Sequence, residues 1–304
     1  MSRHILYNGI MGLAIGDAMG VPHEFKSRDC MKNNPVTGFI GGGIWNQPEG
    51  TWSDDTAMTL ATIDALNNNE WKVTDKCLAD IMDNFLKWYL NGEYAACGVR
   101  FDIGNTCELA IAKWKIHRTR SNEFVCTGVG GNAYGNGALM RMLPCIFLSN
   151  EDTDKIGRLT HDSNLCSAVN IFYIKLLRNI IKNRNKIEAF DIAKETSKKY
   201  LENIPLKFMR TTTEEFMNIK DDDIKSSGYV IDTIEAAVWC FLTTDNYRDC
   251  ILKAVNLGND TDTIAAIAGS MAGLYYGINE DNGIPNEWIN KLRDIDTIKN
   301  LLYK

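Results

Sequence analysis

Two acidic segments hold the residue types best suited to chemistry in this chain. They are "GTWSDDTAMTL" at 50–60 and "LGNDTDTIAAI" at 257–267, and each sets paired aspartates among hydroxyl residues directly before an apolar stretch. Such residues at a helix start commonly cap its free N–H groups. The same carboxylate and hydroxyl oxygens are the ligands that Mg²⁺, Mn²⁺ and Ca²⁺ prefer. The candidate metal ligands are Ser53, Asp54, Asp55, Asp260, Asp262 and Thr263.

The spacing of these aspartates favours two cations over one. Adjacent residues at a helix start project about 100° apart, so Asp54 and Asp55 suit a two-metal site better than joint ligation of one ion. Asp260 and Asp262 are two residues apart and can converge from a turn. Four gathered carboxylates repel one another unless cations compensate their charge. This interpretation requires the two helix starts to meet in space, and Glu24 in "GDAMGVPHEF" is a further candidate.

A glycine-rich segment, "TGVGGNAYGNGALMRMLP" at 127–144, offers a second kind of chemistry. We expect it to lead into a helix. Backbone N–H groups freed by the glycines, helped by a helix N-terminus, can then bind a phosphate group. The alternative is a flexible surface loop, and the residues alone do not decide between the two. Its glycines are Gly128, Gly130, Gly131, Gly135 and Gly137.

Histidine chemistry is sparse in this chain, which has four histidines and no H-E-x-x-H, Walker, G-x-G-x-x-G or G-x-S-x-G motif. A transition-metal site rich in histidine is therefore not expected. His161 in "LTHDSNL" precedes a predicted helix. It can cap that helix or contact a ligand, and for a lone histidine capping is the stronger expectation.

Composition and charge indicate a soluble globular protein. Of 304 residues, 45% are apolar and 24% charged, and the net charge is −6 with no block of basic residues, which argues against nucleic acid as the main partner. The most apolar stretch, 264–278, is too short to cross a bilayer, and the N-terminus lacks the features of a secretory signal. Nine scattered cysteines suggest buried thiols in a reducing compartment. We expect a cytoplasmic, monomeric protein.

The elements that must position these residues are helices. Apolar residues recur at helical spacing through most of the chain, whereas alternating strand patterns are scarce. Gly269 and Gly273, four residues apart, would let another helix approach closely, and Asn91-Gly92 and Gly277 are expected helix ends. No linker divides the chain, so we predict one all-α domain over 1–304, a compact multi-helix bundle. The expected helices are 5–19, 56–67, 76–90, 106–117, 163–182, 187–202, 231–243, 246–256, 264–276 and 286–303.

In order along the chain, these motifs resemble the ADP-ribosylglycohydrolase family, which includes the dinitrogenase reductase-activating glycohydrolase and the ADP-ribosyl-acceptor hydrolases. The resemblance spans 5–277, although the charged region 183–230, with its solvated Asp221–Asp223 run, matches no family motif. The matching pieces are "GLAIGDAMGVPHEF" at 12–25, "GTWSDDTAM" at 50–58, "DIGNT" at 102–106, "GNGALMR" at 135–141, "LTHDS" at 159–163 and "GNDTDTIAAIAG" at 258–269.

The resemblance implies a compact all-α bundle with a binuclear Mg²⁺ or Mn²⁺ centre in a central cleft. The metal ligands would be the six oxygen-bearing residues named above, and the catalytic carboxylates would be Glu24, Asp55 and Asp102. The loop that surrounds the diphosphate and ribose would supply Asn132, Ala133, Tyr134, Gly135, Asn136 and Gly137, and His161 would contact the ligand. Asn259 replaces the glycine usual before the second acidic pair, a change that should leave coordination intact.

The implied activity is removal of ADP-ribose from a modified protein. Asp102 falls where arginine-specific members carry an aspartate, which favours arginine-linked over serine-linked ADP-ribose. Two alternatives stay open. Clustered aspartates with Mg²⁺ also serve two-metal phosphoesterases acting on nucleotides, and the family includes a structural lens crystallin relative, although every acidic position is retained here.

Overall fold

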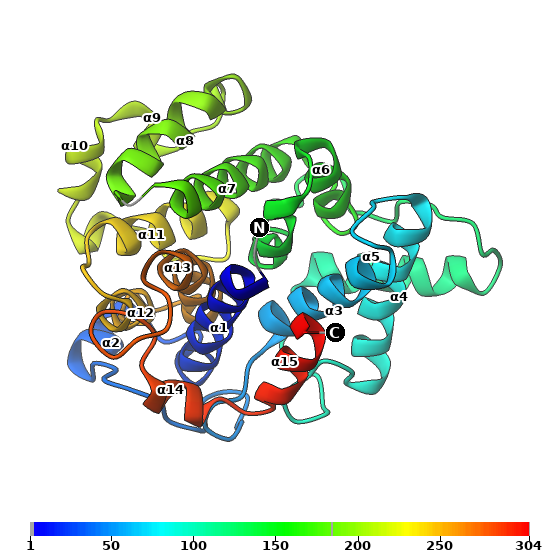
Figure 1. Ribbon diagram of the computed structural model, residues 1–304, viewed down its shortest axis with the longest axis horizontal. Coiled ribbons are helices and arrows are strands. Elements are labelled where there is room, and N and C mark those ends of the chain that lie inside the picture. The colour runs from blue at the N-terminus through cyan, green and yellow to red at the C-terminus, as the bar shows by residue number, and fades with distance from the viewer. Residues whose placement is uncertain (1–2, 184, 304) are drawn as a thin grey trace.

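The chain folds as an assembly of helices around one central antiparallel pair (Figure 1), in a computed structural model that describes residues 3–183 and 185–303. The central pair is α1 (Arg3–Gly20) and α13 (Thr261–Tyr276). The remaining long helices are α3 (Asp54–Asn68), α4 (Asp75–Asn91), α5 (Asn105–Arg118), α7 (Asn164–Lys182), α8 (Lys186–Leu201), α11 (Val230–Leu242) and α12 (Tyr247–Asn256). Within the described residues β-structure is limited to isolated bridges, so the prediction of an all-α fold is confirmed.

Short helical segments connect the long ones. They are α2 (Arg28–Asn33), α6 (Asn150–Arg158), α9 (Lys207–Arg210), α10 (Thr213–Met217), α14 (Asn286–Lys291), α15 (Ile295–Tyr303) and the 3₁₀ turns η1 (Val21–His23), η2 (Leu139–Arg141), η3 (Leu143–Phe147) and η4 (Asp221–Asp223). In Figure 1, α3, α4 and α5 lie on one side of the central pair and α11 and α12 on the other, with α7 and α8 along one edge. A single hydrophobic cluster includes residues from every α-helix named here. None of the described helices is at once long and apolar enough to span a bilayer.

Glycines allow the two central helices to touch along their backbones. A Cβ atom added at Gly269 would lie 2.2 Å from the carbonyl oxygen of Gly12, so the close approach expected at this position is confirmed. At the other end of the interface, a Cβ at Gly20 would lie 2.3 Å from the Cα of Asp262. The end of α1 therefore lies directly against the start of α13. This contact brings the segment around Glu24 next to the second acidic segment.

Two helix predictions are wrong. The stretch 286–303 is not one helix, because the chain turns between α14 and α15, where Asp294 has a φ of +47°. There Arg293 donates its N–H to the carbonyl of Gly50 at 2.9 Å and its Nε to that of Glu49 at 3.0 Å. The glycine-rich segment does not lead into an α-helix either. It enters the 3₁₀ turns η2 and η3, and Pro144 near the start of η3 has no N–H to donate to a carbonyl of the preceding turn, so one α-helix cannot run unbroken through this stretch.

Candidate active site

The start of α3 is capped from a different helix. The buried carboxylate of Asp17, on α1, accepts hydrogen bonds from the N–H of Ser53 at 2.8 Å and from the N–H and hydroxyl of Thr56 at 3.0 and 2.6 Å. This carboxylate satisfies the free backbone donors that Asp54 or Asp55 could have capped. Of the two interpretations of the first acidic segment, simple capping is therefore not supported. Asp54 and Asp55 are buried all the same.

The two acidic segments meet at the centre of the molecule. Thr263 on α13 donates its hydroxyl to Asp55 Oδ2 at 3.4 Å, across 208 positions of sequence, and Ser53 Oγ donates to the same oxygen at 3.1 Å. Asp260 occupies the N-cap position of α13 without capping it; its Oδ2 accepts instead from Asn136 Nδ2 at 2.6 Å. The spatial condition on which the two-metal interpretation depended is met.

Two overlapping groups of carboxylates have the geometry to hold a metal ion. Asp17, Asp55 and Asp262 each present an oxygen within 4.8 Å of the others, and so do Glu24, Asp102 and Asp262, which makes Asp262 common to both groups. Asp55 Oδ1 and Asp262 Oδ2 are buried and lack a hydrogen-bond partner among the described residues. An unpaired buried carboxylate oxygen is costly. A divalent cation with oxygen ligands would satisfy both atoms, so the residues present fit such an ion.

Burial and mutual repulsion shift the protonation of this cluster. Burial, followed by the charge of Asp102, raises the pKa of Glu24 to about 9, and burial raises that of Asp17 to about 6. The pKa values of Asp55 and Asp262 lie well above the usual aspartate range for the same reason. Without a cation the cluster therefore retains protons near neutral pH. A bound cation must displace them.

Sequence reasoning missed Asp17 as a member of this cluster. Its signal was present, because Asp17 is the one acidic residue in the apolar stretch "IMGLAIGDAMGV". A carboxylate in the middle of a buried helix demands a polar partner. The partner's identity could not be read from the sequence, since the N–H groups that Asp17 caps belong to the start of a helix more than thirty residues later.

A cavity of about 550 Å³ opens beside the acidic cluster. Its lining includes the carboxylates Glu24, Asp54, Asp102 and Asp260 and, from the glycine-rich segment, Gly135, Asn136 and Gly137. His161 and Thr263 complete the predicted residues found there. The predicted loop residues Asn132, Ala133 and Tyr134 are placed outside this lining, and the buried Ala133 uses its carbonyl to accept from Cys166 Sγ at 3.4 Å.

The glycine-rich segment is fixed on the cavity wall by the region 226–233. Asn136 donates its N–H to the carbonyl of Gly228 at 3.1 Å and its side-chain amide to Thr233 Oγ1 at 3.0 Å. Ser227 and Gly228 also line the cavity. This region matched no family motif, and only the small residues of "KSSG" hinted at a close backbone approach. The glycine-rich segment is thus held in place at Asn136.

His161 is buried, uncharged and oriented by its neighbours. Arg141 Nη2 donates to Thr160 Oγ1 at 2.7 Å, so this hydroxyl can donate its own proton to His161 Nδ1 at 2.9 Å. In the tautomer in which Nδ1 accepts from this hydroxyl, Nε2 carries the hydrogen; Nε2 lies at the cavity wall near Gly135. Burial and the charge of Arg141 lower the pKa of His161 to about 3. The histidine does not cap α7, whose cap is Ser163, accepting from the N–H of Cys166.

Asn259 takes over the role of a glycine at a tight turn. Its φ is +63°, a left-handed conformation that asparagine tolerates better than most residues. Its carbonyl accepts from the N–H of Phe25 at 2.7 Å, and its N–H donates to Lys26 at 2.7 Å. The substitution preserves the turn that holds the Glu24 segment against Asp260.

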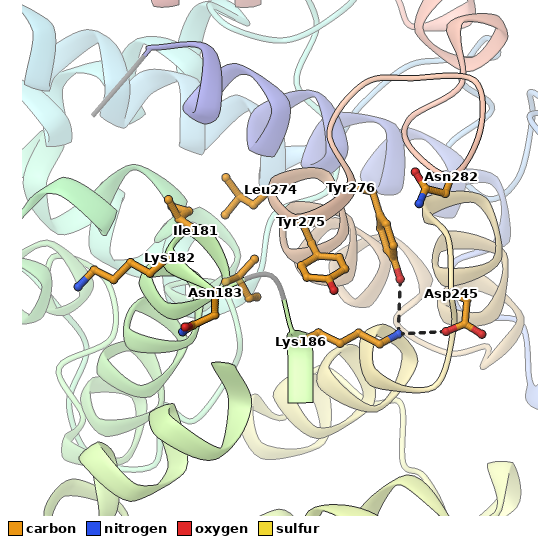
Figure 2. Close-up of a pocket in the computed structure, with 10 residues that line it drawn as sticks. Ile181, Lys182, Asn183, Lys186, Asp245, Leu274, Tyr275, Tyr276 and Asn282 are labelled. Atoms are coloured by element: carbon orange, nitrogen blue, oxygen red, sulfur yellow. Dashed lines mark hydrogen bonds and ion pairs between the residues drawn. The ribbon is translucent and has the colours of Figure 1, made fainter. Parts of the chain in front are cut away.

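A second cavity, of about 570 Å³, lies at the far end of α13 between α7, α8 and the turn before α12 (Figure 2). Figure 2 shows Lys186 reaching across it to Tyr276 and Asp245, at 3.4 and 3.6 Å. The same ammonium donates to the carbonyl of Phe241 at 3.3 Å and to that of Thr244, at the end of α11. Lys186 therefore has a structural role, because it links the ends of α11 and α13. The cavity beside the acidic cluster is the better candidate for the active site.

The fold and cavity together define a class: an all-helical protein with a buried acidic centre beside a glycine-lined cavity. The ADP-ribosylglycohydrolase family model matches residues 4–303. The chain is 33% identical to the ADP-ribosylarginine hydrolase Tri1 of Serratia proteamaculans, over 96% of this chain and 76% of that protein. It is 26% identical to the ADP-ribosyl-[dinitrogen reductase] glycohydrolase of Rhodospirillum rubrum, covering 93% and 88%.

This protein belongs to the ADP-ribosylglycohydrolase family. The membership predicted from six ordered motifs is confirmed. A solved structure of an ADP-ribosylglycohydrolase-related protein complex has the same fold, with a TM-score of 0.73, 24% identity and coverage of 99% of this chain and 96% of that one.

Proposed function

We propose that this protein is a metal-dependent hydrolase that releases ADP-ribose from modified arginine side chains of proteins. The observation that carries the proposal is the meeting of two acidic helix starts beside a cavity whose lining includes Asp102. The name of the Serratia relative, which specifies ADP-ribosylarginine, supports the linkage.

Two divalent cations, Mg²⁺ or Mn²⁺, are the proposed cofactors. Their ligands are Ser53, Asp54, Asp55, Asp260, Asp262 and Thr263, with Glu24 at the same centre. Bound there, the cations would hold the ribose hydroxyls and polarise the attacking water. The unpaired oxygens of Asp55 and Asp262 support the assignment.

The glycine-rich segment and His161 bind the rest of ADP-ribose in this proposal. Gly135, Asn136 and Gly137 offer exposed backbone at the cavity wall, suited to a diphosphate. In the tautomer that carries its hydrogen on Nε2, His161 is a neutral donor at the same wall. Asn132, Ala133 and Tyr134 lie outside the cavity lining and would contact only those parts of the substrate that extend beyond it.

The reaction is hydrolysis at the C1 carbon of the ribose. Water attacks C1 as the bond to the guanidino nitrogen breaks, and the proton that the water releases leaves with the guanidine as guanidinium. Positive charge develops on the sugar in the transition state. The carboxylates of Glu24 and Asp55 stabilise this charge, and Asp102 holds the departing guanidinium with charge-assisted hydrogen bonds.

Incubation with ADP-ribosylated arginine and serine peptides in the presence of Mg²⁺ tests the proposal. We expect free ADP-ribose and unmodified peptide, formed faster from the arginine linkage. AMP or inorganic phosphate as the product would establish the phosphoesterase alternative, and no turnover of any substrate would favour the structural one.

A cytoplasmic location and a monomeric state are part of the same proposal. All nine cysteines are free thiols in the structure, as suits a reducing compartment. Fractionation of the cells that express the protein and light scattering of the purified chain test these two points.

A further inference from the structure

Three aromatic rings form a continuous row that begins with Phe25 in the lining of the acidic cavity. The ring centroids of Phe25 and Trp45 are 6.5 Å apart, and those of Trp45 and Phe101 are 5.9 Å apart. We call Phe25, Trp45 and Phe101 the aromatic arc. Phe25 is 62% exposed although it belongs to the cavity lining, and the other two rings are half-buried. The fold gains little from a phenylalanine so exposed.

Each residue of the aromatic arc is either next in sequence or hydrogen-bonded to a carboxylate of the cavity. Phe25 directly follows Glu24, Phe101 directly precedes Asp102, and the indole N–H of Trp45 donates to Glu24 Oε2. Glu24 and Asp102 in turn belong to one carboxylate group, with oxygens within 4.8 Å of each other. The aromatic arc thus lies next to the carboxylates Glu24 and Asp102 of the cavity lining.

The backbone holds the aromatic arc in place before any substrate arrives. Phe25 and Asp102 both have left-handed backbones, with φ of +63° and +50°, a conformation that costs free energy in such residues. The turn that carries Trp45 closes through the bridge between Gly42 and Gln47. It also packs so tightly on η1 that a Cβ at Gly43 would lie 2.6 Å from Pro22. Such preorganisation is typical of a binding surface.

We propose that the aromatic arc is the subsite for the leaving arginine and the adjoining peptide. This inference rests on the proposed function. A guanidinium is a planar cation that stacks on aromatic faces and pairs with carboxylates, and the aromatic arc with Asp102 offers both. The aliphatic stem of arginine packs on the exposed ring of Phe25, where a serine-linked substrate has no equivalent group. The arc therefore adds to the preference for a long cationic leaving group.

Leucine substitutions at Phe25 and Phe101 test the subsite, because leucine keeps bulk and loses the aromatic face. Trp45 is unsuited to this purpose, since its replacement also removes a hydrogen bond to Glu24. The KM and kcat for ADP-ribosylarginine are measured with Mg²⁺, together with the Kd of free ADP-ribose by calorimetry. We expect each variant to raise KM about tenfold, the scale of a cation–π contact. The Kd of ADP-ribose, which has no guanidinium, should change less than twofold.

Two further variants serve as controls. Phe101→Tyr keeps an aromatic face and should restore a KM close to that of the wild type. Tyr303→Leu removes an exposed aromatic ring on α15 that packs 5.6 Å from the ring of Tyr7, outside the cavity lining, and should leave both measurements unchanged. If Phe25→Leu and Phe101→Leu weaken ADP-ribose and ADP-ribosylarginine equally, or affect neither, the subsite is wrong while the proposed function stands. If the wild type fails to cleave ADP-ribosylarginine at all, both fall together.

Discussion

Asp17 and Thr56 form the link between the central helix α1 and the acidic start of α3. The carboxylate of Asp17 accepts both the N–H and the hydroxyl of Thr56, at 3.0 and 2.6 Å. One buried carboxylate is thus used for capping, while Oδ1 of its neighbour Asp55 has no hydrogen-bond partner among the residues that the structure describes. Because Asp17 caps α3 and Asp55 does not, substitutions at the two positions should affect the free energy of unfolding differently.

Asp17→Ala should destabilise the metal-free protein, whereas Asp55→Asn should not. The first change removes a helix cap and leaves buried N–H groups unpaired, at a cost of about 1–3 kcal/mol. The second removes a charge from a repelling cluster and should leave the free energy of unfolding unchanged or higher. Urea denaturation in EDTA measures both. A larger loss for Asp55→Asn than for Asp17→Ala would return Asp55 to a capping role.

The same two aspartates illustrate what the sequence could predict. The long helices and their ends at Gly92 and Gly277 follow from apolar periodicity and glycine, which act over a few neighbouring residues. The acidic segments were also recognisable, because their residue types are unusual before an apolar helix. Whether the two acidic segments meet in space could not be predicted, because it depends on how α1, α3 and α13 pack together.

The features that the sequence analysis missed or predicted wrongly depend on contacts between distant parts of the chain. The break between α14 and α15 depends on Arg293 bonding to Gly50, a contact between distant parts of the chain. The capping role of Asp17 likewise depends on a helix that begins at Asp54. The aromatic arc joins residues from three separate loops. Local patterns contain no information about such contacts.

The free energy of unfolding should depend on pH differently with and without cations. Glu24 has a folded-state pKa of about 9 against its usual 4.5, so between these values the folded chain holds a proton that the unfolded chain has lost. In EDTA this contribution is fully present below pH 4.5 and is lost as the pH rises through 9. The free energy of unfolding should fall by about 1.4 kcal/mol per pH unit for each such proton.

Saturating Mg²⁺ should remove or reverse this slope, because cations replace the protons and bind better as the pH rises. Glu24→Gln is the control, and its slope in EDTA should be shallower than that of the wild type. Urea titrations at pH 6, 7 and 8 provide the measurement. Identical slopes in EDTA and Mg²⁺ would contradict cation binding at this cluster.

Gly135→Val should weaken ADP-ribose binding without unfolding the protein. A Cβ at Gly135 meets His161 Nε2 at 3.4 Å, an ordinary contact, and the added methyl groups would occupy the cavity wall where the diphosphate is expected. We expect a loss of affinity of roughly tenfold or more, since displaced backbone hydrogen bonds to a charged group are worth about 1.5–3 kcal/mol.

Gly130→Val is the matched control, because a Cβ there is 3.7 Å from the carbonyl of Asp162 and outside the cavity lining. Calorimetry with ADP-ribose and Mg²⁺ compares the two variants. Equal affinities for the wild type and Gly135→Val would mean that the segment is only a surface loop.

Asp102→Ala should impair cleavage of arginine-linked ADP-ribose far more than binding of ADP-ribose itself. The guanidinium can form two parallel hydrogen bonds with a carboxylate, whereas the hydroxyl released from serine is neutral and gains nothing from a fixed negative charge. The simpler explanation, that Asp102 caps α5, is not supported, because the N-cap position of that helix is Gly104. We expect kcat/KM for ADP-ribosylated arginine peptides to fall about 10- to 100-fold, in line with a charge-assisted pair. The Kd of ADP-ribose should change little, and Asp102→Glu should recover part of the activity. A wild-type enzyme that cleaves serine peptides faster than arginine peptides would show that this carboxylate does not select the linkage.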